Sequence, residues 1–103
     1  MRHDAVVETD LTLCALLWAV PGQERALSDY EDTVLALIPE HGARVVERVI
    51  GDGADGTPHE VQIYAFPDPA ALEGYLADPR RLALGELRDR VIARTETFPV
   101  RRA

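Results

Sequence analysis

The segment from Pro39 to Arg44 constrains the fold more than any other, because a helix has to become a strand within it. Before this segment, apolar residues recur mostly at spacings of three and four, which is typical of one face of a helix. After it, residues 44–50 are β-branched and charged in the pattern of a strand. Gly42 can adopt the left-handed conformation that closes a helix, which other residues adopt only at a cost. The segment therefore predicts a helix, a turn and a strand, with an imidazole, a guanidinium and the Glu47 carboxylate close together in sequence.

Hydrophobic runs and helix caps predict the remaining elements. An Asp-Pro pair indicates the start of a helix, since aspartate caps the first turn and proline fits its first position. Glycines, aspartates and a proline crowded into residues 51–58 predict a loop between two strands of a hairpin. In chain order we expect a strand at 11–18, a helix carrying the apolar residues from Leu27 to Ile38, strands at 43–50 and 60–66, a short helix from Asp68-Pro69, a longer one from Asp78-Pro79, and a strand at 95–100.

This order predicts an α+β fold of the ferredoxin-like βαββαβ type. With right-handed crossovers, the four strands form an antiparallel sheet that carries its helices on one face. Residues 1–10 are polar and lack periodicity, so we expect a flexible N-terminal arm before a single domain at 11–103. Nothing in the chain covers the opposite face of the sheet, and we therefore expect a homodimer formed sheet to sheet through that open face.

Charge and composition argue against several classes of function. The 103-residue chain has a net charge of −7, which disfavours nucleic acid and anionic membrane surfaces as partners. No apolar run approaches the length of about 20 residues that spans a bilayer, so we expect a cytoplasmic protein. All eleven basic residues are arginine, which excludes Schiff-base catalysis by a lysine of this chain. The single cysteine, Cys14, and the scattered His3, His41 and His59 lack the spacing of metal ligands, so we expect no metal site.

Two segments of the chain resemble a family of small bacterial domains of unknown function. Residues 40–44 (Glu-His-Gly-Ala-Arg) resemble the Glu-His-Gly-Gly-Arg turn of that family, with Ala43 in place of its second glycine. Residues 61–68, followed by Ala71, Tyr75 and Asp78-Pro79, are similar to the segment in which those domains have a hydrophobic strand, Phe-Pro-Ser, a helix, a tyrosine and Ser-Pro.

The resemblance covers about residues 11 to 100 and implies the dimeric α+β barrel superfamily. That superfamily also holds cofactor-free antibiotic-biosynthesis monooxygenases, muconolactone isomerase-like enzymes and certain haem-degrading enzymes. It implies a pocket between the sheet and the helices of each subunit. No catalytic set is common to the superfamily, so the polar positions that the turn motif itself matches, His41 and Arg44, are the leading candidates.

Three residues in and after the turn are the candidate catalytic groups. His41 either caps a helix C-terminus, which stabilises a cation by about 0.3–1 kcal/mol, or acts as a general acid or base at the rim of the pocket. On a straight strand Glu47 and Arg44 point to opposite faces, and the apolar neighbours Val45 and Val49 place Glu47 toward the helices. Burial there would raise the pKa of its carboxyl, whereas an ion pair at a sheet edge is the alternative. Arg44 would hold a developing oxyanion.

Four aromatic residues are the candidates for substrate binding. Trp18 and Tyr64 lie near the ends of the first and third strands, which are neighbours in this topology, and would form one wall that stacks on a planar ligand. Tyr30 and Tyr75 lie on helix faces and would contribute hydroxyl groups from above the sheet. For all four residues, packing in the core without a ligand is the alternative.

These features favour a cofactor-independent enzyme, of the oxygenase, cyclase or isomerase type, that begins by removing a proton from a small apolar carbonyl or aromatic compound. Its setting would be bacterial secondary metabolism such as antibiotic biosynthesis. A non-catalytic homodimer that binds a small ligand or serves as an accessory protein is the alternative, and haem binding through His41 ranks third. The enzyme hypothesis predicts that His41 and Glu47 line one cavity with Trp18 and Tyr64.

Overall fold

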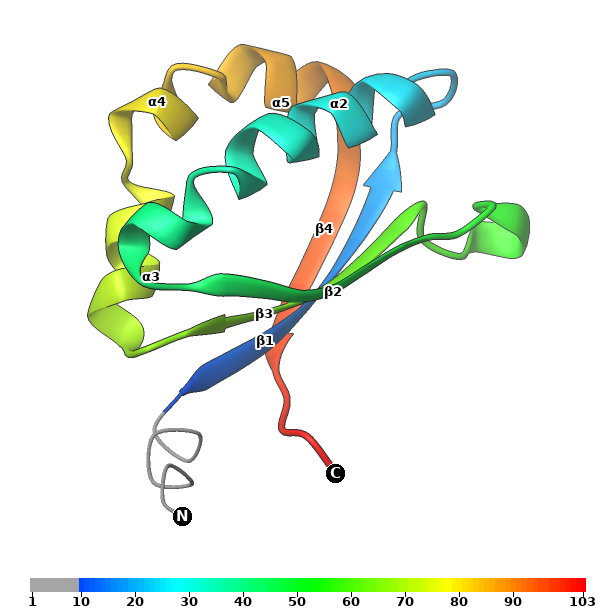
Figure 1. The fold of residues 1–103 in the computed structure, drawn as a ribbon. Helices are drawn as coiled ribbons and strands as arrows, with labels where there is room; N and C mark the ends of the chain where they lie inside the picture. The colour runs from blue at the N-terminus through cyan, green and yellow to red at the C-terminus, as the bar shows by residue number, and fades with distance from the viewer. Residues whose placement is uncertain (1–9) are drawn as a thin grey trace.

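A computed structural model describes residues 10–103 as a four-stranded antiparallel sheet with helices packed on one face (Figure 1). The α+β, ferredoxin-like fold predicted from the sequence is confirmed. Of the predicted arm at residues 1–10, all but Asp10 lies outside the described residues. The elements, in chain order, are β1 (Leu11–Ala19), α2 (Glu24–Leu35), the 3₁₀ turn η1 (Ile38–His41), β2 (Arg44–Ile50), the 3₁₀ turn η2 (Ala54–Gly56), β3 (Glu60–Phe66), α3 (Pro69–Leu76), α4 (Pro79–Leu82), α5 (Gly85–Val91) and β4 (Ile92–Pro99).

The strand order is β2-β3-β1-β4, which places β1 and β3 in the middle of the sheet as predicted. The predicted helix starts are confirmed: Asp68 accepts a hydrogen bond from the backbone of Ala71 at 2.8 Å, and Asp78 accepts one from the backbone of Arg80 at 2.9 Å. The longer helix expected from Asp78 is instead two short ones, α4 and α5, and the second begins at Gly85, a residue that is costly inside a helix. No helix within residues 10–103 has the length and apolar character required to span a bilayer.

The turn after α2 has the predicted conformation. The last turn loosens into η1, where Pro39 cannot donate a backbone hydrogen bond. Gly42 closes it with φ of 74°, and its backbone N–H bonds back to carbonyls of η1. The chain is thereby redirected into β2.

A bulge in β2 changes which of its side chains share a face. Arg44 lies opposite Ala65 and Glu47 lies opposite Ile63, so three steps along β2 match two steps along β3. Directly opposed residues of an antiparallel pair share a face, and Arg44 and Glu47 therefore point the same way. The predicted opposite orientation, with Glu47 toward the helices, is wrong: Glu47 is exposed, and Arg48 is the residue that reaches α2.

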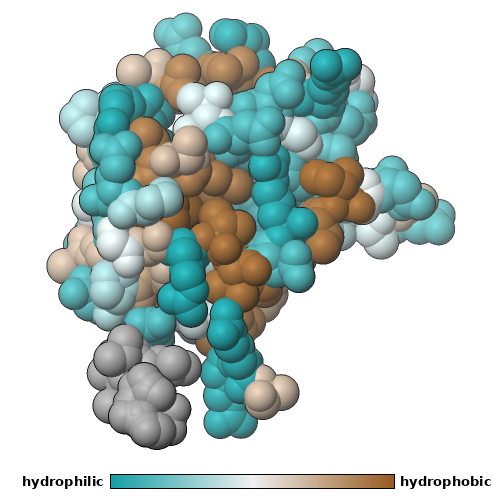
Figure 2. Space-filling model, in the orientation of Figure 1, coloured by the Kyte–Doolittle hydropathy of each residue, from teal (hydrophilic) through white to brown (hydrophobic). Residues whose placement is uncertain are grey.

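The face of the sheet away from the helices is largely apolar across its middle. The register aligns Val49, Val61 and Leu16 in one row, and places Ile63, Cys14 and Phe98 in the next. Val49 remains 47% exposed and Phe98 41% exposed. In the orientation of Figure 1, which includes the helices, hydrophobic groups reach the surface between hydrophilic ones, and one of them lies at the base of the β2–β3 loop (Figure 2). We call the face of the sheet that points away from the helices the outer face.

A buried ion pair joins β2 and β3 to α2. The Glu60 side chain has no exposed surface, and its carboxylate accepts hydrogen bonds from Arg48 Nε at 2.6 Å and Nη2 at 2.9 Å. The Ser28 hydroxyl and the Gln62 amide donate to the same carboxylate at 2.7 and 2.9 Å. Burial alone would raise the pKa of Glu60, but these hydrogen bonds outweigh it and the pKa is lowered. Glu60 is therefore an anion at neutral pH although it lies in the interior.

We expect the substitution Arg48→Met to lower the free energy of unfolding at pH 7 by about 3–5 kcal/mol, because it leaves the Glu60 carboxylate buried and unpaired. In the wild type, the pKa of Glu60 is lower when folded than when unfolded, so its stabilisation is present above the unfolded pKa and is lost as the pH falls through the folded one. Without Arg48, burial should raise the pKa of Glu60, so the carboxyl becomes neutral in acid. The difference in free energy of unfolding between the variant and the wild type should therefore shrink as the pH falls. Urea titrations at several pH values measure this. The Arg48→Met/Glu60→Gln double variant should recover most of the loss; an unchanged deficit would contradict the pairing.

Candidate functional site

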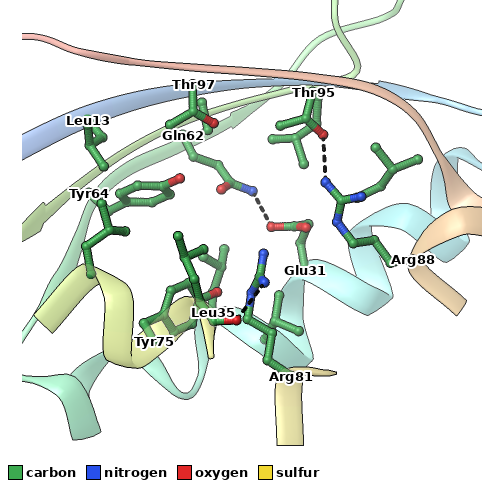
Figure 3. A pocket seen from close by; sticks show the side chains of 16 residues that line it. Leu13, Glu31, Leu35, Gln62, Tyr64, Tyr75, Arg81, Arg88, Thr95 and Thr97 are labelled. Carbon is green, nitrogen blue, oxygen red and sulfur yellow. Dashed lines mark hydrogen bonds between the residues drawn. The ribbon is translucent and has the colours of Figure 1, made fainter. Parts of the chain in front are cut away.

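A cavity of about 220 Å³ lies between the sheet and the helices (Figure 3). Strands β1, β3 and β4 form its floor, and helices α2 to α5 form its roof and sides. A pocket in this place is what the resemblance implies. Its apolar lining comes from Leu13, Ala15, Leu17, Val34, Leu35, Leu72, Leu76 and Ile92, and its polar lining from Glu31, Gln62, Tyr64, Tyr75, Arg81, Arg88, Thr95 and Thr97.

Glu31 supplies the one carboxylate among the described residues that line the cavity. It lies on α2, is only 6% exposed, and its Oε1 accepts a hydrogen bond from Gln62 Nε2 at 2.9 Å. Burial raises the pKa of Glu31, and the negative charge of Glu60 raises it further, while the hydrogen bond from Gln62 and the charges of Arg48 and Arg81 oppose the shift. A buried carboxylate with a raised pKa in a cavity is typical of a proton-transfer group.

The amide of Gln62 fixes the position of this carboxylate. Gln62 lies on the helix-facing side of β3 between Glu60 and Tyr64, in the alternation expected of a strand. Its Nε2 donates one hydrogen bond to Glu31 and a second to Glu60, each of 2.9 Å, so both N–H groups of the amide are used. Arg48, Glu60, Gln62 and Glu31 thus form one continuous polar chain from the edge of the sheet to the cavity.

Two arginines bring positive charge to the cavity. Arg88 Nη2 donates to the Thr95 hydroxyl at 3.3 Å. The guanidinium carbon of Arg81 lies 5.1 Å from the centre of the Tyr75 ring, and its Nε is buried without a hydrogen-bond partner in the described part of the chain. Figure 3 shows both guanidinium groups directed toward the side of the cavity where Glu31 lies.

Tyr64 and Tyr75, two of the four predicted substrate-binding residues, line the cavity. Burial raises the pKa of Tyr75 to about 12 against an opposing hydrogen bond from Arg81 and the positive charge of that residue, and burial raises the pKa of Tyr64 against an opposing hydrogen bond with Thr97. Both hydroxyls are therefore neutral at physiological pH and can donate hydrogen bonds. Their role toward a substrate stays a prediction.

The other two aromatic residues do not line the cavity. Tyr30 is 2% exposed and packs with Leu27 and Val34 in the core, and its hydroxyl lacks a partner within residues 10–103. Trp18 shares the outer face with Leu16, because side chains alternate along β1. Its Nε1 donates to the Gly56 carbonyl at 2.8 Å, and the Arg94 guanidinium carbon lies 4.2 Å from the centre of its ring.

The three predicted catalytic residues also lie outside the cavity lining. Arg44 is on the outer face, 3.5 Å from the Asp10 carboxylate, and Glu47 is on the same face. His41 lies behind the cavity wall, with its ring edge-to-face against Tyr75 at a centroid distance of 5.9 Å. The prediction that His41 and Glu47 share one cavity with Trp18 and Tyr64 is wrong, because only Tyr64 lines it.

His41 instead joins the two motifs that carry the resemblance. Its Nε2 donates to Asp78 Oδ2 at 2.9 Å, and Asp78 also accepts from Arg80, which reaches Glu40 at 3.1 Å. Hydrogen bonds from Arg80, and then from His41, hold the pKa of Asp78 well below its usual range. We call these four residues the turn–helix contact; it fixes η1 against the start of α4.

Sequence signals for the cavity residues existed but were missed. Glu31 follows Leu27 by one helical turn and precedes Val34 by three residues, so it interrupts the apolar stripe of α2. Arg81 and Arg88 are seven residues apart, a spacing that would place them near one face of the continuous helix expected from Asp78, although the structure divides that helix into α4 and α5. Within residues 10–103, no three His, Cys, Asp or Glu side chains are grouped so that they could hold a metal ion.

No family model and no curated protein matches the chain. Solved structures with the same fold include a candidate antibiotic biosynthesis monooxygenase from Bacteroides thetaiotaomicron, with a TM-score of 0.74, 13% identity, and coverage of 93% of this chain and 91% of that one. A dimeric protein of unknown function and ferredoxin-like fold from Bacteroides fragilis has a TM-score of 0.69, 14% identity and coverage of 91% and 97%. SnoaB, a cofactor-independent oxygenase from Streptomyces nogalater, has a TM-score of 0.67, 16% identity and coverage of 92% and 96%. The similarity is one of fold.

We expect Glu31→Gln to be more stable than the wild type at neutral pH, because it removes a buried charge and keeps an oxygen that accepts from Gln62. The pKa of Glu31 is higher when folded than when unfolded, so wild-type stability falls as the pH rises from the unfolded value, about 4.3, through the folded one. The advantage of the variant should therefore vanish below about pH 4. Thermal unfolding across pH measures it, with Glu73→Gln, an exposed change on α3, as the control. A variant that is less stable than the wild type at every pH would contradict this assignment.

Proposed function

We propose that the protein is a cofactor-independent enzyme that removes a proton next to the carbonyl group of a small, largely apolar compound, with Glu31 as the general base. One observation carries the proposal: Glu31 is a buried carboxylate with a raised pKa in a mainly aliphatic cavity. A general base works best when its pKa lies near the operating pH, and burial shifts a carboxylate in that direction.

The surroundings of Glu31 suit proton transfer. Gln62 holds Oε1, while Oε2 has no hydrogen-bond partner within residues 10–103 and is available for a proton. Loss of the proton places negative charge on the carbonyl oxygen of the substrate. The neutral hydroxyls of Tyr64, on β3, and of Tyr75, on α3, supply donors for that oxygen. The resulting enolate is the common first intermediate of isomerisation, cyclisation and reaction with molecular oxygen.

The structural relatives support the oxygenase branch of this proposal. SnoaB is a cofactor-independent oxygenase, and a candidate antibiotic biosynthesis monooxygenase has the same fold. Because fold does not fix function, the argument for proton abstraction rests on Glu31 and not on these relatives. A place in bacterial secondary metabolism belongs to the same proposal. Arg44 and Glu47 have no part at this cavity, and their catalytic role stays a prediction from the sequence.

We expect the wild type to accelerate the exchange of an acidic C–H proton for deuterium in D₂O. The test compounds are a panel of small aromatic 1,3-dicarbonyl compounds. Glu31→Gln should slow this exchange by about 10²–10⁴-fold, the usual contribution of a general base. Mass spectrometry of the compounds measures exchange whatever reaction follows the enolate. Glu73→Gln is the matched control and should exchange at the wild-type rate.

Other outcomes would point elsewhere. Loss of exchange in Glu47→Gln, with Glu31→Gln unaffected, would move the base to the outer face and overturn the proposal. Compounds that bind in the cavity without exchange in any of them would favour the non-catalytic ligand-binding protein.

The proposal includes a homodimer formed through the outer face. That face exposes Val49 and Phe98, and a relative with the same fold is dimeric. We expect native mass spectrometry to give twice the chain mass of 11.4 kDa. Val49→Asp should give monomers, because it places a charge within the apolar surface that the contact would bury. Leu82→Asp on α4, at a side chain that is 60% exposed, is the control and should stay dimeric. A monomeric wild type would contradict this assembly.

A further inference from the structure

Two guanidinium groups of the cavity have no acidic partner in the part of the chain that the structure describes. The arginines that do pair with carboxylates in the described part of the chain are Arg44, Arg48, Arg80 and Arg94. Within residues 10–103, no carboxylate oxygen lies within salt-bridge distance of Arg81 or Arg88, although both line the cavity beside Glu31. Their positive charges are therefore available to a ligand.

Within residues 10–103, these two groups use only part of their hydrogen-bonding capacity. A guanidinium has five N–H donors, and leaving a buried donor unpaired costs about 1–3 kcal/mol. Arg81 Nε is buried without a partner among the described residues. The rest of this guanidinium makes a 3.5 Å contact with the Leu76 carbonyl and a hydrogen bond that acts on the Tyr75 hydroxyl, so Nε is its clearly unused donor. Arg88 donates to the Thr95 hydroxyl at 3.3 Å, a long hydrogen bond to a neutral group.

The charge of the cavity is opposite to that of the whole chain. Its lining carries two guanidinium groups and one carboxylate, whereas the chain as a whole has a net charge of −7. Glu31 forms no salt bridge with either arginine in the part of the chain described, so it does not neutralise them directly. An excess of positive charge in a small, mainly apolar space selects an anion that also has an apolar body.

We infer that the cavity binds its ligand through a carboxylate held by Arg81 and Arg88, so that the substrate class is small aromatic or otherwise largely apolar carboxylic acids. The planar guanidinium fork matches a carboxylate in a way that a neutral carbonyl group cannot use. The aliphatic floor and the Tyr64 and Tyr75 rings would contact the apolar body. That the bound acid is a substrate rests on the proposed function. Its binding by the two arginines does not require Glu31 to act as a base.

The experiment compares 2-naphthoate with 2-naphthamide, which has nearly the same shape and no charge. We expect isothermal titration calorimetry at pH 7.5 to show the acid bound at least about tenfold more tightly than the amide, since hydrogen bonds to charged groups contribute about 1.5–3 kcal/mol. Added salt should weaken binding of the acid and leave the amide unchanged. Equal affinities for the two compounds, or no measurable binding of 2-naphthoate, would overturn the inference.

Variants test the residues. Arg81→Gln and Arg88→Gln should each weaken 2-naphthoate binding by about tenfold or more and leave the amide almost unaffected. Arg25→Gln, an identical change at an exposed position of α2, is the matched control and should bind like the wild type. Glu31→Gln should bind the acid more tightly, because it removes a negative charge beside the ligand. That gain in affinity cannot arise from misfolding, so the test holds even if an arginine variant is unstable.

The outcomes separate this inference from the proposed function. Binding of acids that depends on both arginines, with no deuterium exchange in any compound, would support the inference and overturn the enzymatic proposal. Exchange that depends on Glu31 in neutral carbonyl compounds, with acids bound no better than amides, would support the enzyme and overturn the inference.

Discussion

The side-chain amide of Gln62 holds two buried carboxylates at once, and the arrangement of the cavity depends on it. Arg48 keeps Glu60 ionised in the interior, so Glu60 can only accept hydrogen bonds. Because the Glu60 carboxylate can only accept, the Gln62 amide must point its Nε2 and not its oxygen toward Glu60. The same Nε2 then donates its second hydrogen bond to Glu31. An ion pair at the edge of the sheet therefore determines the orientation of a carboxylate in the cavity. Such a network stabilises one arrangement because a half-satisfied one would be costly.

The fold could be predicted because its signals are local. Asp68 and Asp78 each cap a helix through their own side chains, Gly42 takes the φ that closes a turn, and the apolar run of β1 suits a central strand. Each of these signals acts within a few residues. The bulge in β2 could not be predicted from alternation, because one inserted residue moves every later side chain to the other face. The error over Glu47 follows from that single residue.

The site was harder to predict, for a different reason. The residues that carry the resemblance include Glu40, His41 and Asp78, yet these three are joined to one another, directly or through Arg80. The motif therefore marks how η1 meets α4, and the chemistry of the cavity lies in residues outside it. Glu31 shares a helix face with Leu27, where a charged side chain is unexpected. A carboxylate inside an apolar stripe was the signal that would have located the cavity.

The turn–helix contact has a consequence for how such a protein diversifies. Helix α4 has only four residues, Pro79–Leu82, and its direction is set by the cap at Asp78. Arg81 lies on that short helix and reaches the cavity from it. Substitutions in this segment can change the charge presented to a ligand while the Arg48–Glu60 pair and the sheet remain intact. Related proteins with this fold can therefore differ in ligand preference through changes in one helical turn, while the sheet and its buried ion pair stay the same.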